Sequence, residues 1–334
     1  MRPKEYRIKE LLREKGLDGA IVSSPENFHY VTGFGGHQHT VSRQPGFTLA
    51  VMRADDKVPT HLTTMDFEAA TFRIKAAGLN FVVDPYDTWV GLKTWDEIAH
   101  GAVVPDKTAM ESSMDKLVQF MKACDLANKK VGVELDYLPV PYYKSLTEKF
   151  PEAEFVDISD LFVYARSVKQ PDEIEMFRNL CRIADHGFTE VSKIAKIGVS
   201  ERELAQCFRE DVIKSGFCAP SSWSMFSTGP SSARLTLPGD GVVKDGDVVK
   251  FDAGVNAEFD FYTTDTSRAW IIGNGDPALL KLKDRLYEGQ RRMIAAAKPG
   301  LPINELYHTA YDYVKEIKKQ LNISKFIDLY SSKE

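Results

Sequence analysis

Short apolar runs alternate with amphipathic segments along the first half of the chain. The apolar runs lie at 18–24, 46–52, 79–83 and 131–135, and a further short strand is expected at 61–64. Helical patterns lie between them, at 3–15, from about 65 onward, and at 111–128. Buried strands of this length separated by helices are typical of a sheet with helices packed on it. We therefore predict an α/β domain over residues 1–163.

The second half of the chain has a different order of elements. Apolar residues from Ile174 to Val191 recur at steps of three and four, which predicts an amphipathic helix. Pro171 suits the first turn of that helix, where its missing N–H would have no partner anyway. Ser200 and Glu203 form a capping-box pattern that predicts the start of a second helix. Strands rich in aromatic and β-branched residues are predicted at 223–228, 247–253, 258–263 and 266–272, and further helices at 278–297 and 303–320.

This order of helices, antiparallel strands and helices predicts an α+β domain over residues 164–334. The connection between the two domains is expected in LFVYARSVKQPDE, residues 161–173. A chain of 334 residues is too long for one ordinary core, so its length agrees with two domains.

Composition and charge narrow the class of protein. The sequence is 43% hydrophobic and 27% charged, as in soluble globular proteins. Its net charge of −5 provides no broad electrostatic attraction to nucleic acid or to an anionic membrane. No apolar run approaches the roughly 20 residues that cross a bilayer, and the charged N-terminus lacks the apolar core of a signal peptide. The four cysteines include no CxxC pair, as expected for free thiols in a reducing compartment. We therefore predict a cytoplasmic protein that binds neither nucleic acid nor membrane.

Four stretches of sequence, in one order along the chain, carry a family resemblance. They are REKGLDGAIVSSPENFHYVTGF (13–34), ARSVKQPDEIEMFRNLCRIAD (165–185), FSTGPSSARLTLPGDGVVKDGDVVKFDAG (226–254) and FYTTDTSRAWIIG (261–273). Together they resemble the creatinase/Xaa-Pro peptidase family (M24, pita-bread fold), and its prolidase-like members in particular. The resemblance extends over nearly the whole chain.

The resemblance implies an α/β N-terminal domain followed by an α+β pita-bread catalytic domain, assembled as a homodimer. Metal-dependent members bind two divalent ions, such as Mn or Co, through two Asp, one His and two Glu. They cleave a small peptide amide bond with a metal-activated water, often a bond that precedes proline. The implied function is that of an Xaa-Pro dipeptidase or aminopeptidase.

Asp252 and Asp265 match the two metal-binding aspartates of the family. Asp252 ends a predicted strand before Ala253 and Gly254, and Asp265 starts the next strand. Paired strands can direct both carboxylates into one cleft, and hard oxygen ligands suit divalent ions. The residues by themselves also allow a simpler interpretation, in which Asp252 forms a turn with Gly254 and Asp265 caps locally beside Thr266.

Three features depart from the family pattern. The two aspartates are thirteen positions apart, two more than usual, and a longer hairpin can absorb the difference. Asp260, at the tip of that hairpin, could join the metal site but is expected to be solvated. Leu235 occupies the place of a histidine that stabilises the reacting carbonyl, and leucine has no titratable group. The stretch after the strand 266–272 is predicted to be helical, with a surface histidine at His308. The catalytic domain is therefore expected to be incomplete, as a fragment or through loss of its His and Glu ligands.

Further polar residues are candidates for ligand contacts. His37, His39 and Arg43 lie in GGHQHTVSRQPG, directly after the TGF segment. On an extended strand the two histidines would share one face and could bind a metal together, whereas an exposed loop is the simpler interpretation. In the resemblance this region contacts substrate across the dimer, so we predict substrate binding by His39 and Arg43. Arg268 is expected to brace a nearby carboxylate through two parallel hydrogen bonds.

Three functions stay open at the level of sequence. The first is a metallopeptidase with Asp252 and Asp265 as metal ligands. The second is a hydrolase or lyase of a small non-peptide molecule, which Leu235 favours because a peptidase-like histidine is missing there. The third is a catalytically inactive family member that binds a peptide or protein partner.

Overall fold

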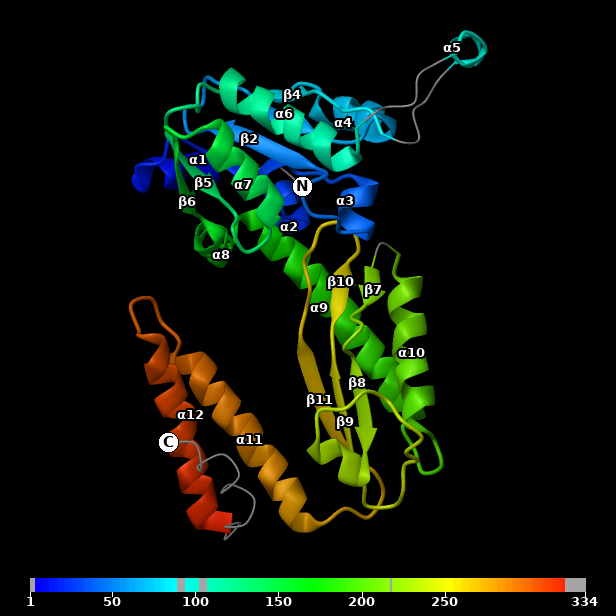
Figure 1. Ribbon diagram of the computed structural model, residues 1–334. Coiled ribbons are helices and arrows are strands. Elements are labelled where there is room, and N and C mark those ends of the chain that lie inside the picture. Colours follow the sequence, from blue (N-terminus) through cyan, green and yellow to red (C-terminus); the bar gives the residue numbers. More distant parts are fainter. Residues whose placement is uncertain (1–3, 89–93, 102–106, 217, 322–334) are drawn as a thin grey trace. The chain divides into compact units, whose positions relative to one another are not determined.

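The computed structural model describes residues 4–88, 94–101, 107–216 and 218–321, and its contacts divide the chain into two compact units (Figure 1). Unit 1 comprises residues 1–178 together with 257–262, and unit 2 comprises 179–256 and 263–334. The short segment 257–262 thus belongs to unit 1, although its neighbours on both sides belong to unit 2. The end of the predicted second domain, 322–334, lies outside the described residues.

Unit 1 is built on a mixed sheet of six strands in the order β4-β3-β2-β1-β5-β6. The pairs β1–β2 and β2–β3 are antiparallel, and the other three pairs are parallel. The strands are β1 (Gly19–Val22), β2 (Leu49–Arg53), β3 (Thr60–Thr63), β4 (Phe81–Val83), β5 (Lys130–Val133) and β6 (Glu154–Asp157). The apolar runs predicted the first five at nearly these positions. The strand β6 was missed because its side chains are half-buried or exposed and give no apolar run.

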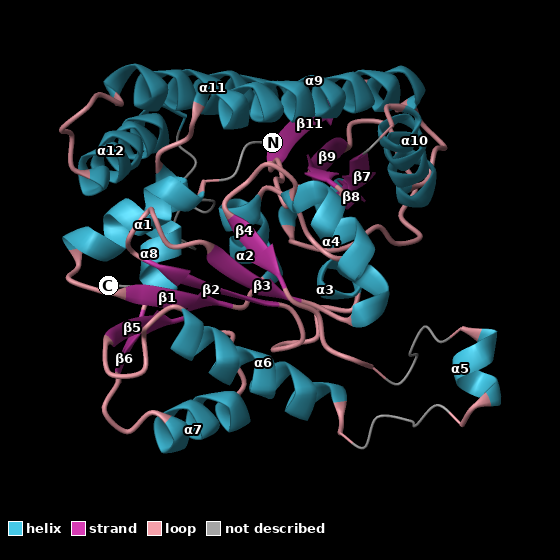
Figure 2. Cartoon of the chain, turned by 90° about the horizontal axis from the view of Figure 1, so that it is seen from above, coloured by secondary structure: helices cyan, strands magenta, loops and turns pink. Residues whose placement is uncertain are grey.

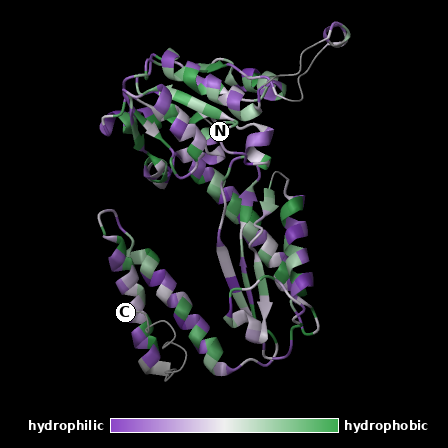
Figure 3. Ribbon diagram, viewed as in Figure 1, coloured by the Kyte–Doolittle hydropathy of each residue, from purple (hydrophilic) through white to green (hydrophobic). Residues whose placement is uncertain are grey.

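Helices cover both faces of this sheet (Figure 2). Side chains alternate between the faces, so that Ala20 and Val22 join one apolar cluster while Ile21 joins the other. One face is packed by α1 (Glu5–Glu14), α2 (Pro25–Thr32), α4 (Ala69–Ala76) and α8 (Ser159–Ser167), and the other by α6 (Ala109–Ala123) and α7 (Val140–Lys149). Figure 3 shows the hydrophobic strand β2 between these layers. The predicted α/β architecture of this half is confirmed.

The segment 161–173, predicted as a linker, is mostly helical. The helix α8 ends at Ser167, and Leu161, Phe162 and Ala165 on it are buried in the core of unit 1. The first part of the segment therefore packs as part of unit 1, because three apolar side chains at helical spacing outweigh the charged residues that follow them. The predicted boundary at 163/164 falls inside this helix.

Unit 2 contains a three-stranded antiparallel sheet in the order β11-β9-β8. Its elements are β8 (Met225–Thr228), β9 (Val248–Ala253) and β11 (Thr266–Ile271), with a two-stranded pair of β7 (Cys218–Pro220) and β10 (Val255–Ala257) and a 3-10 turn η2 (Gly229–Ala233). The strand predicted at 258–263 does not form. Phe261 adopts a left-handed backbone conformation with φ of 59°, which breaks the extended chain there.

The helices of the second half lie where the sequence placed them. The helix α9 (Pro171–Ile194) begins at the predicted proline, and α10 (Glu201–Lys214) begins after a capping box formed by Ser200 and Glu203. The helices α11 (Pro277–Ala296) and α12 (Ile303–Leu321) form an antiparallel hairpin in which the ring of Tyr313 covers Gly289. Within the described residues, no helix has the length and apolar character needed to span a membrane.

One face of the β8-β9-β11 sheet carries the apolar core of unit 2. The ring centroids of Phe251 and Trp270 are 4.6 Å apart, and those of Phe226 and Phe251 are 5.1 Å apart. Phe188 of α9 and Phe208 of α10 complete this aromatic cluster, with their own centroids 5.2 Å apart. The cluster holds the sheet on the two helices and leaves the opposite face free for polar side chains.

In unit 1, a fully buried carboxylate fixes the turn between β1 and α2. Glu134 accepts hydrogen bonds from the backbone N–H of Ser23, and from both the backbone N–H (3.1 Å) and the hydroxyl (2.7 Å) of Ser24. The side-chain amide of Asn27 also donates to it. Burial raises the pKa of Glu134, and these donors oppose the rise. The start of α2 therefore depends on a single side chain from β5's end.

We expect Glu134→Ala to destabilise the chain by about 2–4 kcal/mol, because it leaves buried backbone donors without an acceptor. Glu134→Gln should cost less, since its carbonyl oxygen can still accept from the two backbone N–H groups. Urea unfolding followed by circular dichroism measures both. Glu154→Gln, at an exposed ion pair with Lys130, is the control, and equal losses in all three variants would refute the role of Glu134.

Candidate functional site

Strand register brings Asp252 and Asp265 to one face of the unit 2 sheet. Asp252 lies on β9 directly opposite Ser267 of β11. Asp265 immediately precedes β11, two positions before Ser267, and side chains two positions apart point to the same face. The two carboxylates are therefore diagonal neighbours across the strand pair.

The charges of these two aspartates act on each other. The pKa of Asp252 is raised first by partial burial, then by the negative charge of Asp265, while Lys250 lowers it. The ammonium of Lys250 donates to the backbone oxygen of Arg234 at 2.9 Å. Two carboxylates that face each other in this way form an arrangement that a divalent cation would stabilise.

A close approach of two backbone segments holds this arrangement in place. A Cβ atom at Gly254 would lie 2.0 Å from the backbone oxygen of Thr264 and 2.6 Å from the hydroxyl of Ser221. The backbone N–H of Val255 donates to the Thr264 hydroxyl at 2.9 Å, and the Thr264 N–H donates to the Val255 oxygen at 2.9 Å. The chain after Asp252 is thereby locked to the chain before Asp265.

We expect Gly254→Ala to destabilise unit 2 by roughly 2 kcal/mol, because the methyl group forces 254 and 264 apart. Gly239→Ala is the matched control, since its Cβ would meet only the Glu201 carboxylate at 3.4 Å. Thermal unfolding measures the loss of stability in each variant. A Gly254→Ala protein as stable as the control would show that the close approach is not required.

The connection between the two aspartates carries a third carboxylate, that of Asp260, which pairs with a histidine. Its tip, 257–262, belongs to unit 1, where the Asp260 carboxylate lies 3.3 Å from Nε2 of His29. This pairing lowers the pKa of Asp260, and burial opposes the change. The hydroxyl of Tyr262 donates to Glu173 at 2.6 Å. Asp260 is thus half-buried and paired rather than solvated, and no local motif links it to His29, which lies far away in sequence.

The predicted loop around His39 is a short helix, α3 (His37–Val41). The extended geometry that would have let His37 and His39 share a face is therefore absent. His39 is 2% exposed, its Nε2 lies 2.9 Å from the backbone oxygen of Ser23, and its ring contacts Phe28 edge-on. Its Nδ1 has no hydrogen-bond partner within the described chain. Burial lowers the pKa of His39 to about 4.

Arg43 follows α3 in a left-handed conformation, with φ of 51°. Its guanidinium is half-exposed and lies 2.8 Å from the carboxylate of Glu26. The phenol of Tyr137 donates to its backbone oxygen at 3.1 Å. Substrate binding by His39 and Arg43 stays a prediction.

Because the folded chain holds His39 neutral, acid should destabilise it through this residue. The unfolded histidine takes up a proton near pH 6.5 and the folded one near pH 4, so this contribution to stability is lost as the pH falls through that window. In His39→Gln, the acid-induced fall in the free energy of unfolding should be smaller by up to roughly 3 kcal/mol. Urea unfolding from pH 7 to 4 measures this fall. His37→Gln, at an exposed neighbour, should keep the full decline. Identical slopes in both variants would contradict a neutral buried His39.

The remaining candidates occupy surface positions. Leu235 is 79% exposed, and His308 is exposed on α12, as predicted for a surface histidine. Arg268 does brace a carboxylate, but with one nitrogen: Nη2 lies 2.6 Å from Asp185, while Nη1 donates to the Ser267 backbone oxygen. The expected two parallel hydrogen bonds are therefore replaced by one.

Two carboxylates fit one side of a divalent-cation site. Asp252 and Asp265 supply hard oxygen donors whose mutual repulsion a cation would relieve. Over the residues that the structure describes, no group of three or more His, Cys, Asp or Glu side chains is gathered as a complete metal site would require.

Two family models match the chain. The Creatinase/Prolidase N-terminal domain matches residues 6–168, and Metallopeptidase family M24 matches residues 175–329. The chain therefore belongs to the M24 metallopeptidases and carries a creatinase/prolidase N-terminal domain. The resemblance read from the four sequence stretches is confirmed.

Individual relatives agree with this assignment. The Xaa-Pro dipeptidase of Pyrococcus furiosus is 29% identical over 319 residues, which cover 95% of this chain and 78% of that protein. The solved Xaa-Pro dipeptidase from Bacillus anthracis matches with a TM-score of 0.73 at 22% identity, over 93% of this chain and 76% of that one. The prolidase from Pyrococcus horikoshii OT3 matches with a TM-score of 0.70 at 19% identity, over 93% and 76%. These matches confirm the predicted fold, an α/β N-terminal domain followed by a pita-bread catalytic domain.

Proposed function

We propose that this chain is a metal-dependent peptidase in which Asp252 and Asp265 hold a divalent ion such as Mn²⁺ or Co²⁺. The observation that carries the proposal is the pair of carboxylates on one face of the β9–β11 strand pair, inside a domain of a metallopeptidase family. A bound ion of this kind would activate a water molecule and polarise the scissile carbonyl.

The protein's own residues prepare the site for such an ion. The register of β9 and β11 puts both carboxylates on one face, and the close approach of Gly254 to Thr264 supports that register. Lys250, on the same face two positions before Asp252, favours the ionised form of that aspartate. A carboxylate pair held by paired strands loses little conformational entropy on binding an ion, which supports the proposal.

For the substrate, we propose a small peptide with proline in second position. Support comes from the name of the Pyrococcus furiosus relative, an Xaa-Pro dipeptidase at 29% identity. We also propose a homodimer, which the family resemblance implies, in which the half-exposed guanidinium of Arg43 meets the substrate. His39 is less suited to direct contact because its ring is buried.

A hydrolase or lyase of a small non-peptide molecule is the second candidate. Leu235 favours it, because this exposed side chain can neither donate a hydrogen bond nor carry a proton at the position where the family resemblance expects a histidine. A screen of Xaa-Pro dipeptides beside non-peptide amides separates the two candidates.

Asp252→Asn and Asp265→Asn should each weaken Mn²⁺ binding at least about tenfold and remove metal-stimulated hydrolysis of Ala-Pro, because each deletes a negative charge from the pair. Asp240→Asn, at an exposed carboxylate of the same unit, should change neither. Equilibrium dialysis with MnCl₂ and a proline-release assay measure the outcomes. Unchanged metal binding in both site variants would refute the assigned ligands, and metal binding without hydrolysis of any dipeptide would point to the second candidate.

A further inference from the structure

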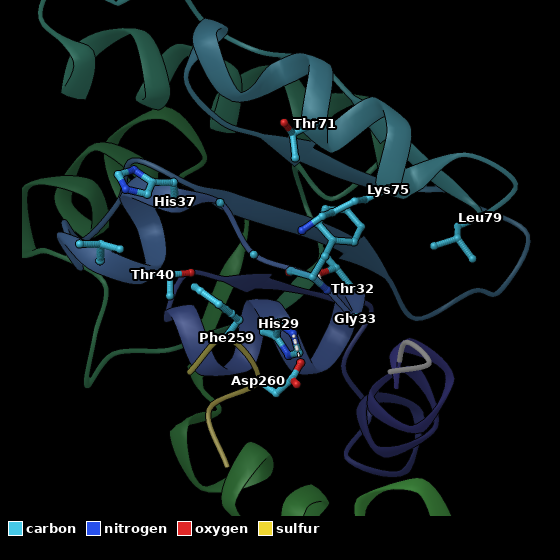
Figure 4. A pocket seen from close by; sticks show the side chains of 14 residues that line it. His29, Thr32, Gly33, His37, Thr40, Thr71, Lys75, Leu79, Phe259 and Asp260 are labelled. Carbon is cyan, nitrogen blue, oxygen red and sulfur yellow. Dashed lines mark hydrogen bonds and ion pairs between the residues drawn. The ribbon is translucent and has the colours of Figure 1, made fainter. Parts of the chain in front are cut away.

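A pocket of about 520 Å³ lies within unit 1 (Figure 4). It is bounded by the end of α2, the glycine-rich segment 33–36, α3, α4 and the hairpin tip 257–262. Neither of the proposed metal ligands lines it, and neither does His39 or Arg43. It is therefore a feature that the proposed function does not use.

The walls of the pocket are largely apolar. Phe34 lines it as a buried side chain, whereas Val41, Leu79 and Phe259 are 65%, 40% and 58% exposed. Large apolar side chains left in water around one hollow are typical of a surface that receives an apolar group. Phe259 comes from the hairpin tip and the others from the N-terminal part of the chain, so the folded unit is needed to assemble them.

The charged groups of the pocket are Asp260, which pairs with His29, and Lys75, whose positive charge also acts on Asp260. His29 and Asp260 lie at its base and satisfy each other, as the dashed line in Figure 4 marks. Lys75 extends from α4 into the pocket, and among the described residues no carboxylate lies within ion-pair distance of its ammonium. The hydroxyls of Thr40 and Thr71 also line the pocket. A single cation among apolar walls matches a monoanion better than a phosphate, which needs several donors.

We propose that this pocket binds a small carboxylate that carries an apolar side chain. The carboxylate pairs with the ammonium of Lys75, and the apolar group packs against Val41 and Phe259. An acylated branched-chain amino acid has both features and a size that the cavity accommodates. Because the pocket lies within unit 1 and contains no proposed metal ligand, binding does not depend on the metal site.

The test is isothermal titration of the whole chain with N-acetyl-L-leucine. N-acetyl-L-leucinamide, which lacks the charge, and acetate, which lacks the apolar group, should each bind at least about tenfold more weakly. Lys75→Met should lower the affinity for N-acetyl-L-leucine at least about tenfold, and Lys75→Arg should retain most of it. Lys122→Met, at an exposed lysine of α6 that does not line the pocket, is the matched control. Circular dichroism verifies that each variant is folded.

Three results would overturn the proposal. They are no binding of N-acetyl-L-leucine by the wild-type chain at millimolar concentration, equal binding of the acid and the amide, or equal losses in the Lys75→Met and Lys122→Met variants. Phe259→Ser should also weaken binding, which verifies that the hairpin tip forms part of the site. Asp252→Asn should leave the affinity unchanged, so failure of the metal assignment and failure of this one are distinguishable.

Discussion

The close approach of Gly254 to Thr264 is the constraint on which the candidate metal centre depends. A side chain at position 254 would overlap the backbone oxygen of Thr264, so glycine is needed for the two segments to meet. Their hydrogen bonds continue the register in which Asp252 faces Ser267. Because side chains alternate along a strand, this register alone puts Asp265 on the same face. The two like charges repel each other, so the side chains themselves do not draw the pair together. Packing of the backbone therefore creates it.

Aromatic packing on the opposite face of the same sheet offsets this repulsion. Phe251 lies next to Asp252 in sequence and points the other way, into the aromatic cluster with Trp270 and Phe188. Burial of such rings is worth several kcal/mol, more than the repulsion between two half-exposed carboxylates. One strand thus combines an apolar anchor with a polar site, and the alternation of its residues keeps the two functions apart.

The hairpin between the two aspartates has a structure that its local sequence does not predict. Its extra length was visible in the spacing, but Asp260 was expected in solvent and 258–263 was expected as a strand. The pairing of Asp260 with His29, and the left-handed turn at Phe261, depend on contacts between residues more than two hundred positions apart. Similarly, α3 replaced an expected loop because the ring of His39 is buried against Phe28. No local pattern encodes such contacts, so they could not be predicted.

The sequence by itself determined the family, the two architectures, the starts of α9 and α10, and the choice of Asp252 and Asp265 as candidate ligands. These features rest on local signals: apolar periodicity, capping residues and short motifs, each of which acts within a few positions. Only the tertiary structure decided that the two aspartates face each other, that Asp260 turns to His29, and that a pocket forms beside Lys75. Those features arise when distant segments pack together, and the free energy of that packing belongs to the folded chain as a whole.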